Sequence, residues 1–261
     1  MSTEVSAKSY WIGYQTIVIK EVTRIVRIWP QTLLPPAITM TLYFVIFGQL
    51  IGRRIGEMGG MDYMQFIVPG LIMLSVITNA YGNITSSFFG AKFGRHVEEL
   101  LISPLPPILI LAGYVTGAVF RSMVVAVLVF GVASFFSDLS IHNWPVTLAV
   151  VLLTAIVFAL GGFINATFAQ KFDDIAIVPT FVLQPLTYLG GVFFSVDLLP
   201  GVWDKIALAN PILYMVNAFR YGMLGVTDVP VAYAFSIIGL FALVLGTICV
   251  TLLKRGTGLR T

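Results

Sequence analysis

The chain has 261 residues, of which 58% are hydrophobic and 10% are charged. Soluble domains carry roughly 25% charged residues, so a soluble fold of this size is excluded. The net charge of +3 is small and the 15 lysines and arginines are spread over many short segments, which argues against a nucleic-acid-binding surface. The long apolar stretches do not alternate as the strands of a barrel would, so the composition indicates an all-α membrane protein.

Residues 1–30 form an N-terminal tail and a predicted amphipathic helix that begins near Lys8 and ends near Trp29. At helical spacing, one face is polar and contains Lys20, Glu21, Arg24 and Arg27. The opposite face contains Trp11, Val18, Val22, Ile25 and Trp29. A basic face opposite tryptophan and aliphatic residues favours a helix that lies in the interface of the inner leaflet, in contact with membrane lipids. A plain anchor that only sets the orientation of the chain fits the same pattern.

Residues 31–261 contain six apolar stretches that are long enough to cross a membrane, because about 20 helical residues span a hydrocarbon core of about 30 Å. These stretches are 31–52, 63–90, 107–136, 145–169, 175–195 and 230–253. None of the 12 acidic residues lies in the middle of a predicted span. The sequence therefore predicts a transmembrane domain with six spans.

The stretch 206–226 is also apolar, but it contains polar and helix-breaking residues, namely Asn210, Pro211, Asn217 and Arg220. If it crossed the membrane, the basic residues near the C-terminus would lie outside, against the positive-inside rule: Lys254, Arg255 and Arg260. We therefore expect a re-entrant hairpin over residues 198–226 on the outer side, between the fifth and sixth spans. Both termini are then cytoplasmic, and protein or a wet cavity must cover the hairpin.

The loop 92–107 between the second and third spans reads KFGRHVEELLISPLPP. Its short helical core begins near Arg95 and should end before Ser103 and Pro104, because the residue before a proline is disfavoured in the α region. Two acidic residues beside two leucines suit docking into the groove of a partner protein: Glu98, Glu99, Leu100 and Leu101. A solvated loop with an acidic pair is the alternative interpretation.

Arg121 is the only charged residue deep within a predicted span. An ionisable group inside a membrane indicates function by default. The predicted spans contain no carboxylate or histidine to pair with it, so a proton relay or a cation site is not expected. Arg121 could face backbone carbonyls, a cavity between helices or an anionic substrate, and a shifted register in which its side chain snorkels to the interface fits equally well.

Aromatic and methionine side chains gather in the first span and around the fifth. They are Met40, Tyr43, Phe44, Phe47, Phe181, Tyr188, Phe193 and Phe194. Adaptable apolar surfaces of this kind suit a path for an amphiphilic substrate. Ordinary helix packing or lipid contact uses the same residue types.

Motifs for catalysis are missing from the sequence. No glycine is followed by lysine, so the phosphate-binding loop G-x-x-x-x-G-K-[ST] does not occur. The only histidines, His96 and His142, fall on opposite sides of the predicted membrane and lack clustered carboxylates or thiols. We therefore expect no enzyme activity, no metal and no cofactor bound by this chain.

The stretch 183–220 reads LQPLTYLGGVFFSVDLLPGVWDKIALANPILYMVNAFR. Several of its residues match together at fixed spacings: Leu183, Leu186, Leu189, Gly190, Val192, Leu199, Pro200, Pro211, Ile212, Tyr214 and Arg220. This stretch resembles the signature of ABC-2 type transport permeases. The order of the other predicted elements agrees with that family over essentially the whole chain, and the short outer loops are similar to those of small enterobacterial inner-membrane permeases.

The resemblance implies the transmembrane subunit of an ATP-binding cassette exporter in a bacterial inner membrane. Such a permease moves a lipid, a lipid-linked glycan or an amphiphilic drug, and a separate ATPase subunit uses the ATP and magnesium. The resemblance further implies two permease copies, as a homodimer, with two ATPase copies.

The same resemblance assigns roles to elements of the chain. The loop from Arg95 to Pro104 corresponds to the coupling helix that receives movement from the ATPase. The path would lie at the dimer interface between the first, second and fifth spans, and the outer hairpin would be a gate that bends at Pro200, Pro211 and Gly222. The rival hypotheses are an ion-coupled carrier or channel and a membrane-embedded enzyme or scaffold, which the missing mid-span acids and catalytic cluster disfavour.

Overall fold

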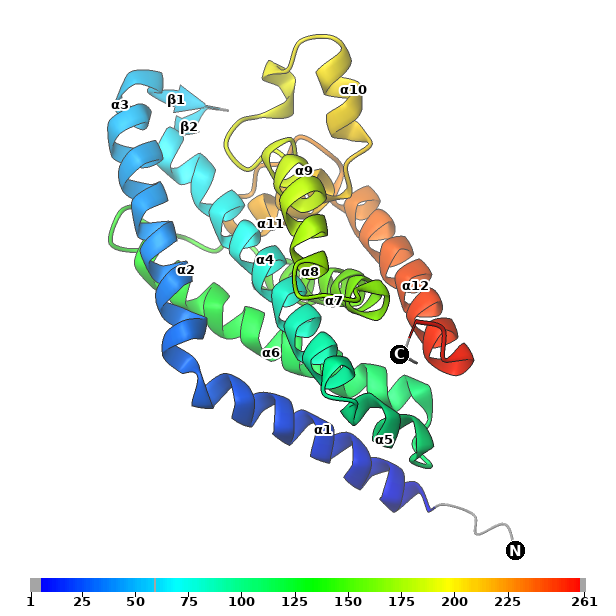
Figure 1. Cartoon of the computed structure of the whole chain (residues 1–261). Coiled ribbons are helices and arrows are strands. Elements are labelled where there is room, and N and C mark those ends of the chain that lie inside the picture. The colour runs from blue at the N-terminus through cyan, green and yellow to red at the C-terminus, as the bar shows by residue number, and fades with distance from the viewer. Residues whose placement is uncertain (1–5, 59, 259–261) are drawn as a thin grey trace, which may run out of the picture.

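The computed structural model describes residues 6–58 and 60–258 (Figure 1). Arg260, which was counted among the C-terminal basic residues, lies outside the described residues. The helical elements in chain order are α1 (Ala7–Arg27), α2 (Trp29–Tyr43), the π-helical η1 (Phe44–Ile51), α3 (Gly52–Ile55), α4 (Tyr63–Phe93), α5 (His96–Ile102), α6 (Pro107–Ala133), α7 (Trp144–Phe168), α8 (Asp174–Val178), the π-helical η2 (Pro179–Leu183), α9 (Gln184–Tyr188), the 3-10 turn η3 (Val196–Leu198), α10 (Val202–Leu208), α11 (Pro211–Leu224) and α12 (Val231–Arg255). Two short strands, β1 (Glu57–Met58) and β2 (Met61–Asp62), pair in antiparallel fashion.

Five helices are long and apolar enough to cross a membrane. They are Trp29–Ile55, which comprises α2, η1 and α3, and the helices α4, α6, α7 and α12. These helices match the first, second, third, fourth and sixth predicted spans to within a few residues. The chain is therefore an all-α membrane protein, as the composition predicted.

Helix α4 forms the centre of the bundle and packs against α6, α7 and α11. Its contact with α7 depends on Gly162, where an added Cβ atom would lie 2.6 Å from the carbonyl oxygen of Tyr81. Small residues let the backbones of two membrane helices approach closely in this way. The central position of α4 allows its side chains to meet α1, α2 and α6 as well.

The fifth predicted span, residues 175–195, is shorter than expected. The helix runs through α8, η2 and α9, three segments of 5 residues each. At ~1.5 Å per residue it is about 22 Å long, less than the hydrocarbon core of about 30 Å. It ends after Tyr188 because the chain turns at Gly190 and Gly191, and Gly191 has a φ of +73° that favours glycine. This element is therefore a partial span.

The chain returns into the bundle through α10 and α11, the region predicted as a hairpin. Asn210 caps α11, since its side-chain oxygen accepts a hydrogen bond from the backbone N–H of Ile212 at 3.0 Å, and Pro211 occupies the first turn, where its missing N–H is tolerated. Most side chains of α11 are buried, and α11 packs against α4, α7 and α12. Protein thus covers this segment, as backbone at membrane depth requires.

Gly222 does not bend the hairpin, contrary to the prediction. Helix α11 continues through it to Leu224, and an added Cβ atom at Gly222 would lie 2.5 Å from the hydroxyl oxygen of Thr147 in α7. The glycine therefore permits a close contact between α11 and the start of α7. The helix ends instead at Gly225, whose φ is +76°.

The two ends of the bundle carry different elements (Figure 1). One end, which we call the α5 end, carries α1, α5 and the end of α12, whereas the other, the α10 end, carries α3, the β1–β2 pair and α10. The basic residues Lys254 and Arg255 finish α12 at the α5 end. Under the positive-inside rule, the α5 end is expected to face the cytoplasm.

Candidate functional site

A cavity of about 420 Å³ lies between α2, α4, α6 and the partial span η2–α9. Its apolar lining residues include Pro35, Pro36, Met40, Leu74 and Leu183. Its polar lining residues include Gln31, Thr39, Tyr43, Ser75, Thr78, Asn79, Arg121, Gln184, Thr187 and Tyr188. Among the described residues that line it there is no carboxylate and no histidine. The cavity thus joins residues of four predicted spans around a single cation.

Part of the polar lining of the cavity lies on a stripe of polar residues along α4. Ser75, Asn79, Asn83 and Ser87 recur every four residues, so they share one face of the helix, and all four are buried. The Oγ of Ser75 donates to the carbonyl of Leu71 at 3.0 Å, and the amide of Asn79 donates to the carbonyl of Ser75 at 3.0 Å. These local bonds satisfy the side-chain donors without breaking the helix, and they leave the side-chain oxygen of Asn79 free to accept.

Arg121 of α6 also lines the cavity, beside this stripe. Its Nε donates to the side-chain oxygen of Asn79 at 3.2 Å, and this is the one hydrogen bond of its guanidinium within the described part of the chain. The structure thus places Arg121 beside a cavity between helices, one of the alternatives that the sequence left open.

The amphipathic helix α1 turns part of its polar face toward the bundle rather than toward water. The prediction placed Glu21 on the polar face with Lys20, Arg24 and Arg27, but Glu21 is 0% exposed. Its carboxylate accepts from the hydroxyl of Ser87 at 2.6 Å and pairs with Arg24 at 3.0 Å. That grouping was therefore wrong for Glu21, because its helix face packs on α4 and α6. Lys20 and Arg27 are exposed, as an interfacial position requires.

Arg24 connects α1 to the stripe on α4. Its Nη2 donates to the side-chain oxygen of Asn83 at 2.8 Å, and Arg24 is itself partly buried. Two glycines of α6 admit the helix, since an added Cβ atom at Gly113 or Gly117 would lie 2.6 Å from Ile17 or Glu21 respectively. The polar stripe of α4 therefore runs from the cavity to the interfacial helix.

The predicted docking loop contains α5, which packs on the end of α4. Arg95 precedes it with a φ of +60°, and Ser103 ends it by donating to the carbonyl of Leu100 at 2.6 Å. Pro104 follows in the exposed turn. Glu98 and Glu99 are exposed, as predicted for a docking surface.

The burial of the two leucines of this loop differs from the prediction, which placed them on a docking surface. Leu100 and Leu101 are partly buried against the bundle, whereas Ile102 is 85% exposed. Because α5 turns its leucines inward, the exposed aliphatic side chain of this helix is Ile102. Sequence reasoning missed it, although its position one turn after Glu98 and Glu99 was the available signal.

The predicted path residues separate into three groups. Met40, Tyr43 and Tyr188 line the cavity, and Phe47 and Phe193 adjoin it, since Phe193 lies 6.1 Å from the ring of Tyr43 and 4.7 Å from that of Phe47. The remaining three lie elsewhere: Phe44 is buried against Phe136, Phe181 is 74% exposed and Phe194 is partly buried outside the lining. The partial span thus brings its aromatic end to the first span.

The family-like stretch 183–220 maps onto contacts between α9, the turn after it and α11. Asn210 donates to the carbonyl of Leu186, an added Cβ atom at Gly190 would lie 2.6 Å from Ile212, and Tyr214 donates to the carbonyl of Leu208 at 2.6 Å. Pro200 lies exposed in the turn before α10. The residues of this stretch therefore form contacts that hold the partial span against the buried helix α11.

Arg220 of α11 is buried at 1% exposure and is surrounded by protein partners. Its guanidinium donates to the carbonyl of Gly191 at 2.6 Å and to Asn217 at 3.3 Å. It also lies 3.9 Å from the carboxylate of Asp228 and 4.0 Å from the ring centroid of Phe66. Arg220 therefore holds the turn at Gly191 in place.

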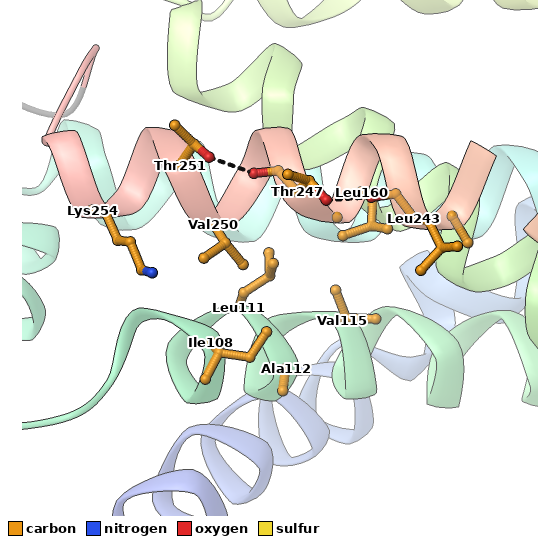
Figure 2. A pocket seen from close by; sticks show the side chains of 12 residues that line it. Ile108, Leu111, Ala112, Val115, Leu160, Leu243, Thr247, Val250, Thr251 and Lys254 are labelled. Atoms are coloured by element: carbon orange, nitrogen blue, oxygen red, sulfur yellow. Dashed lines mark hydrogen bonds between the residues drawn. The ribbon is translucent and has the colours of Figure 1, made fainter. Parts of the chain in front are cut away.

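A second hollow lies on the side of the bundle between α6 and α12 (Figure 2). It is an open groove of about 480 Å³ with mainly aliphatic walls, and Lys254 extends toward one end of it. The hydroxyls of Thr247 and Thr251 donate to backbone carbonyls within α12 at 2.7 Å. Such a surface is typical of lipid contact, so the polar cavity remains the candidate site.

Comparison with known proteins identifies the class. Residues 13–224 match the ABC-2 type transporter family, a range that includes most of α1, the polar cavity, α5 and α11. The chain therefore belongs to the ABC-2 type transporter family and is a transport permease. This confirms the resemblance drawn from residues 183–220.

Two relatives illustrate how similar the chain is to other permeases. It is 55% identical over 252 residues to the inner membrane transport permease YadH of Escherichia coli K12, covering 97% of this chain and 98% of that protein. It is 25% identical over 218 residues to nodulation protein J of Rhizobium leguminosarum bv. viciae, covering 82% of this chain and 83% of that protein. The nearly complete match to an inner membrane permease, together with the five membrane-spanning helices, locates this chain in the inner membrane.

Proposed function

We propose that the chain is the membrane-spanning subunit of an ATP-binding cassette exporter that moves a lipid, a lipid-linked glycan or an amphiphilic drug across the inner membrane. A separate ATPase subunit supplies the energy by hydrolysing ATP with magnesium. Two copies of the chain and two copies of the ATPase form the complex, with both termini in the cytoplasm. Membership of the ABC-2 type family supports an ATPase partner in general.

The observation that carries the exporter proposal is the cavity between α2, α4, α6 and the partial span. Its lining combines apolar and polar side chains, which is the surface an amphiphile needs. Tyr43, Phe47 and Phe193 form a cluster of rings beside it. A substrate with a polar head and an apolar body can contact both kinds of side chain at once.

Coupling to the ATPase is proposed to run through α5 and α1. Helix α5 presents the carboxylates of Glu98 and Glu99 beside the exposed side chain of Ile102. Helix α1 meets the polar stripe of α4 through Glu21 and Arg24. A displacement of the α5 end can therefore reach the cavity through rigid helices rather than through loops.

An ion-coupled carrier is the rival function. Carriers of that kind bind protons or cations with acidic or histidine side chains near the membrane centre. The described lining of the cavity offers no such group and contains the cation Arg121. The ATP-driven mechanism is therefore the better match to the site.

The test is co-purification from mild detergent with the ATPase subunit. The variant Glu98→Ala, Glu99→Ala, Ile102→Asp should reduce the recovered ATPase on the order of tenfold, because it removes both charges and the apolar anchor of the proposed interface. Glu57→Ala is the matched control, since this exposed acid lies at the opposite end of the bundle. Transport of a lipid at full rate by vesicles that contain the permease without any ATPase would contradict the proposal.

A further inference from the structure

Two arginines lie inside the bundle, and their surroundings differ. Arg220 is enclosed by a carbonyl oxygen, an amide oxygen, a carboxylate and an aromatic ring, at the distances given above. Arg121 has one hydrogen bond within the described chain, from Nε to Asn79, and its side chain lines the cavity. A charge at membrane depth needs a partner, because an isolated cation is costly there. Arg220 has its partners within the protein, whereas Arg121 has a place for one in the cavity.

The charges near Arg121 favour an anion as that partner. The described lining residues include no acid. The closest acid along the stripe, Glu21, already pairs with Arg24 and accepts from Ser87. Tyr188 and Gln184 line the same cavity and can donate hydrogen bonds. The cavity therefore presents one positive charge and several donors to whatever enters it.

We propose that the cavity binds the phosphate headgroup of an amphiphile, with the guanidinium of Arg121 as its principal ligand. The planar guanidinium presents paired N–H donors that match two oxygens of a phosphate. The apolar lining residues Pro35, Met40 and Leu183 provide contacts for the tail of the molecule. This inference rests on the proposed function and narrows its substrate class to anionic amphiphiles with a phosphate group.

The experiment uses the permease purified with its ATPase in a maltoside detergent, which carries no phosphate group. The probes are fluorescent phosphatidic acid, the corresponding diacylglycerol that has the same tails without the phosphate, and inorganic phosphate. The native complex should bind phosphatidic acid at least about tenfold more tightly than diacylglycerol, a difference expected for one charge-assisted contact in a low-dielectric site. Inorganic phosphate should compete only weakly, because it lacks the tail.

Two variants test Arg121. Arg121→Gln should reduce phosphatidic acid binding to the level of diacylglycerol, and Arg121→Lys should retain part of the preference. Asn79→Asp keeps the size of the side chain but gives Arg121 a carboxylate within the protein, so it should also abolish the preference. Arg54→Gln, at an exposed position of α3 away from the cavity, is the matched control. An unchanged melting temperature of each variant separates loss of binding from loss of fold.

The inference is overturned if the native complex binds both lipids equally, or if Arg121→Gln and Asn79→Asp leave the preference for phosphatidic acid intact. Competition by inorganic phosphate as strong as that by the lipid would overturn the assignment of an amphiphile. If the ATPase co-purifies and hydrolyses ATP while the lipids are not distinguished, only this inference fails. If no ATPase associates, the proposed function fails independently of the lipid result.

Discussion

The structure gives Arg220 a more specific role than the sequence did. The sequence placed it in an apolar stretch that broke the pattern of a simple span, and the structure shows it buried against Gly191, Asn217 and Asp228. Asn217 lies one turn away on the same helix and Asp228 follows shortly after it, whereas Gly191 lies 29 residues earlier in the chain. A pattern of neighbouring residues could indicate that Arg220 was unusual, but not which groups surround it.

Replacing Arg220 by methionine should destabilise the permease by about 1–3 kcal/mol. The change leaves the buried carbonyl of Gly191 without the guanidinium that donates to it, and a buried acceptor without a donor carries a cost of this size. Thermal unfolding followed by fluorescence in detergent measures the effect. Arg54→Met, at an exposed position, should leave the transition unchanged, and an equal stability of the two variants would contradict the role given to Arg220.

At the scale of elements, α1 is held to the bundle by side-chain hydrogen bonds to α4 and by close packing against two glycines of α6. Glu21 and Ser87 form a hydrogen bond of 2.6 Å, while Gly113 and Gly117 of α6 provide the space for α1. The apolar residues Trp11 and Trp29 remain exposed, at 58% and 55%, where lipid can cover them. The helix is therefore both an interfacial element and a packed part of the bundle.

Gly117→Leu should loosen α1. An added Cβ atom at this position lies 2.6 Å from the Cβ of Glu21, and overpacking of this kind costs about 1–3 kcal/mol. Hydrogen exchange at the amides of α1 should become faster. Gly131→Leu is the matched control on the same helix, because no atom lies within 4 Å of an added Cβ there. Equal exchange in the two variants would show that α1 does not depend on this contact.

At the scale of the whole molecule, α4 is buried except along one stripe. Most of its apolar window, 83%, is buried inside the bundle. Apart from Phe93 at the end of the helix, the exposed positions recur every four residues and are small: Thr78, Gly82, Ser86 and Gly90. Small residues on a membrane helix permit close packing with another helix. The stripe lies beside the cavity, which Thr78 and Gly82 also line, so it supports the proposed dimer with a path at its interface.

A cysteine at Gly82 should therefore cross-link two copies of the permease in native membranes. The experiment uses a Cys249→Ala background, since Cys249 is the single natural cysteine and is buried. Gly239→Cys on α12 is the control, because an added Cβ is free of contacts at both glycines. Disulfide-linked dimers of the Gly82 variant alone support the interface, whereas efficient cross-linking through Gly239 alone would place the second copy on the other side of the bundle.

Composition and local spacing determined a large part of this protein. The class of fold, five of the six spans, the short helix between the second and third spans and the family could all be predicted, because membrane helices need long apolar stretches and because the family stretch 183–220 depends on local spacings. The extent of the fifth span could not be predicted. Hydropathy continues to residue 195, but the positive φ of Gly191 and the packing of Gly190 on Ile212 end the helix at Tyr188.

Only the tertiary structure decided where the polar side chains go. Arg121 of α6 meets Asn79 of α4, and Glu21 of α1 meets Ser87 of α4. Each contact joins helices that are distant in sequence and depends on helix rotation and, for α1, on the close approach that Gly117 allows. Helical periodicity identifies the face that a residue occupies but not the neighbour which that face meets. The sequence by itself thus located an arginine in an apolar stretch that offers it no acid. The three-dimensional packing placed that arginine in a cavity free of acids among its described lining residues, because burial and contact are properties of several helices together.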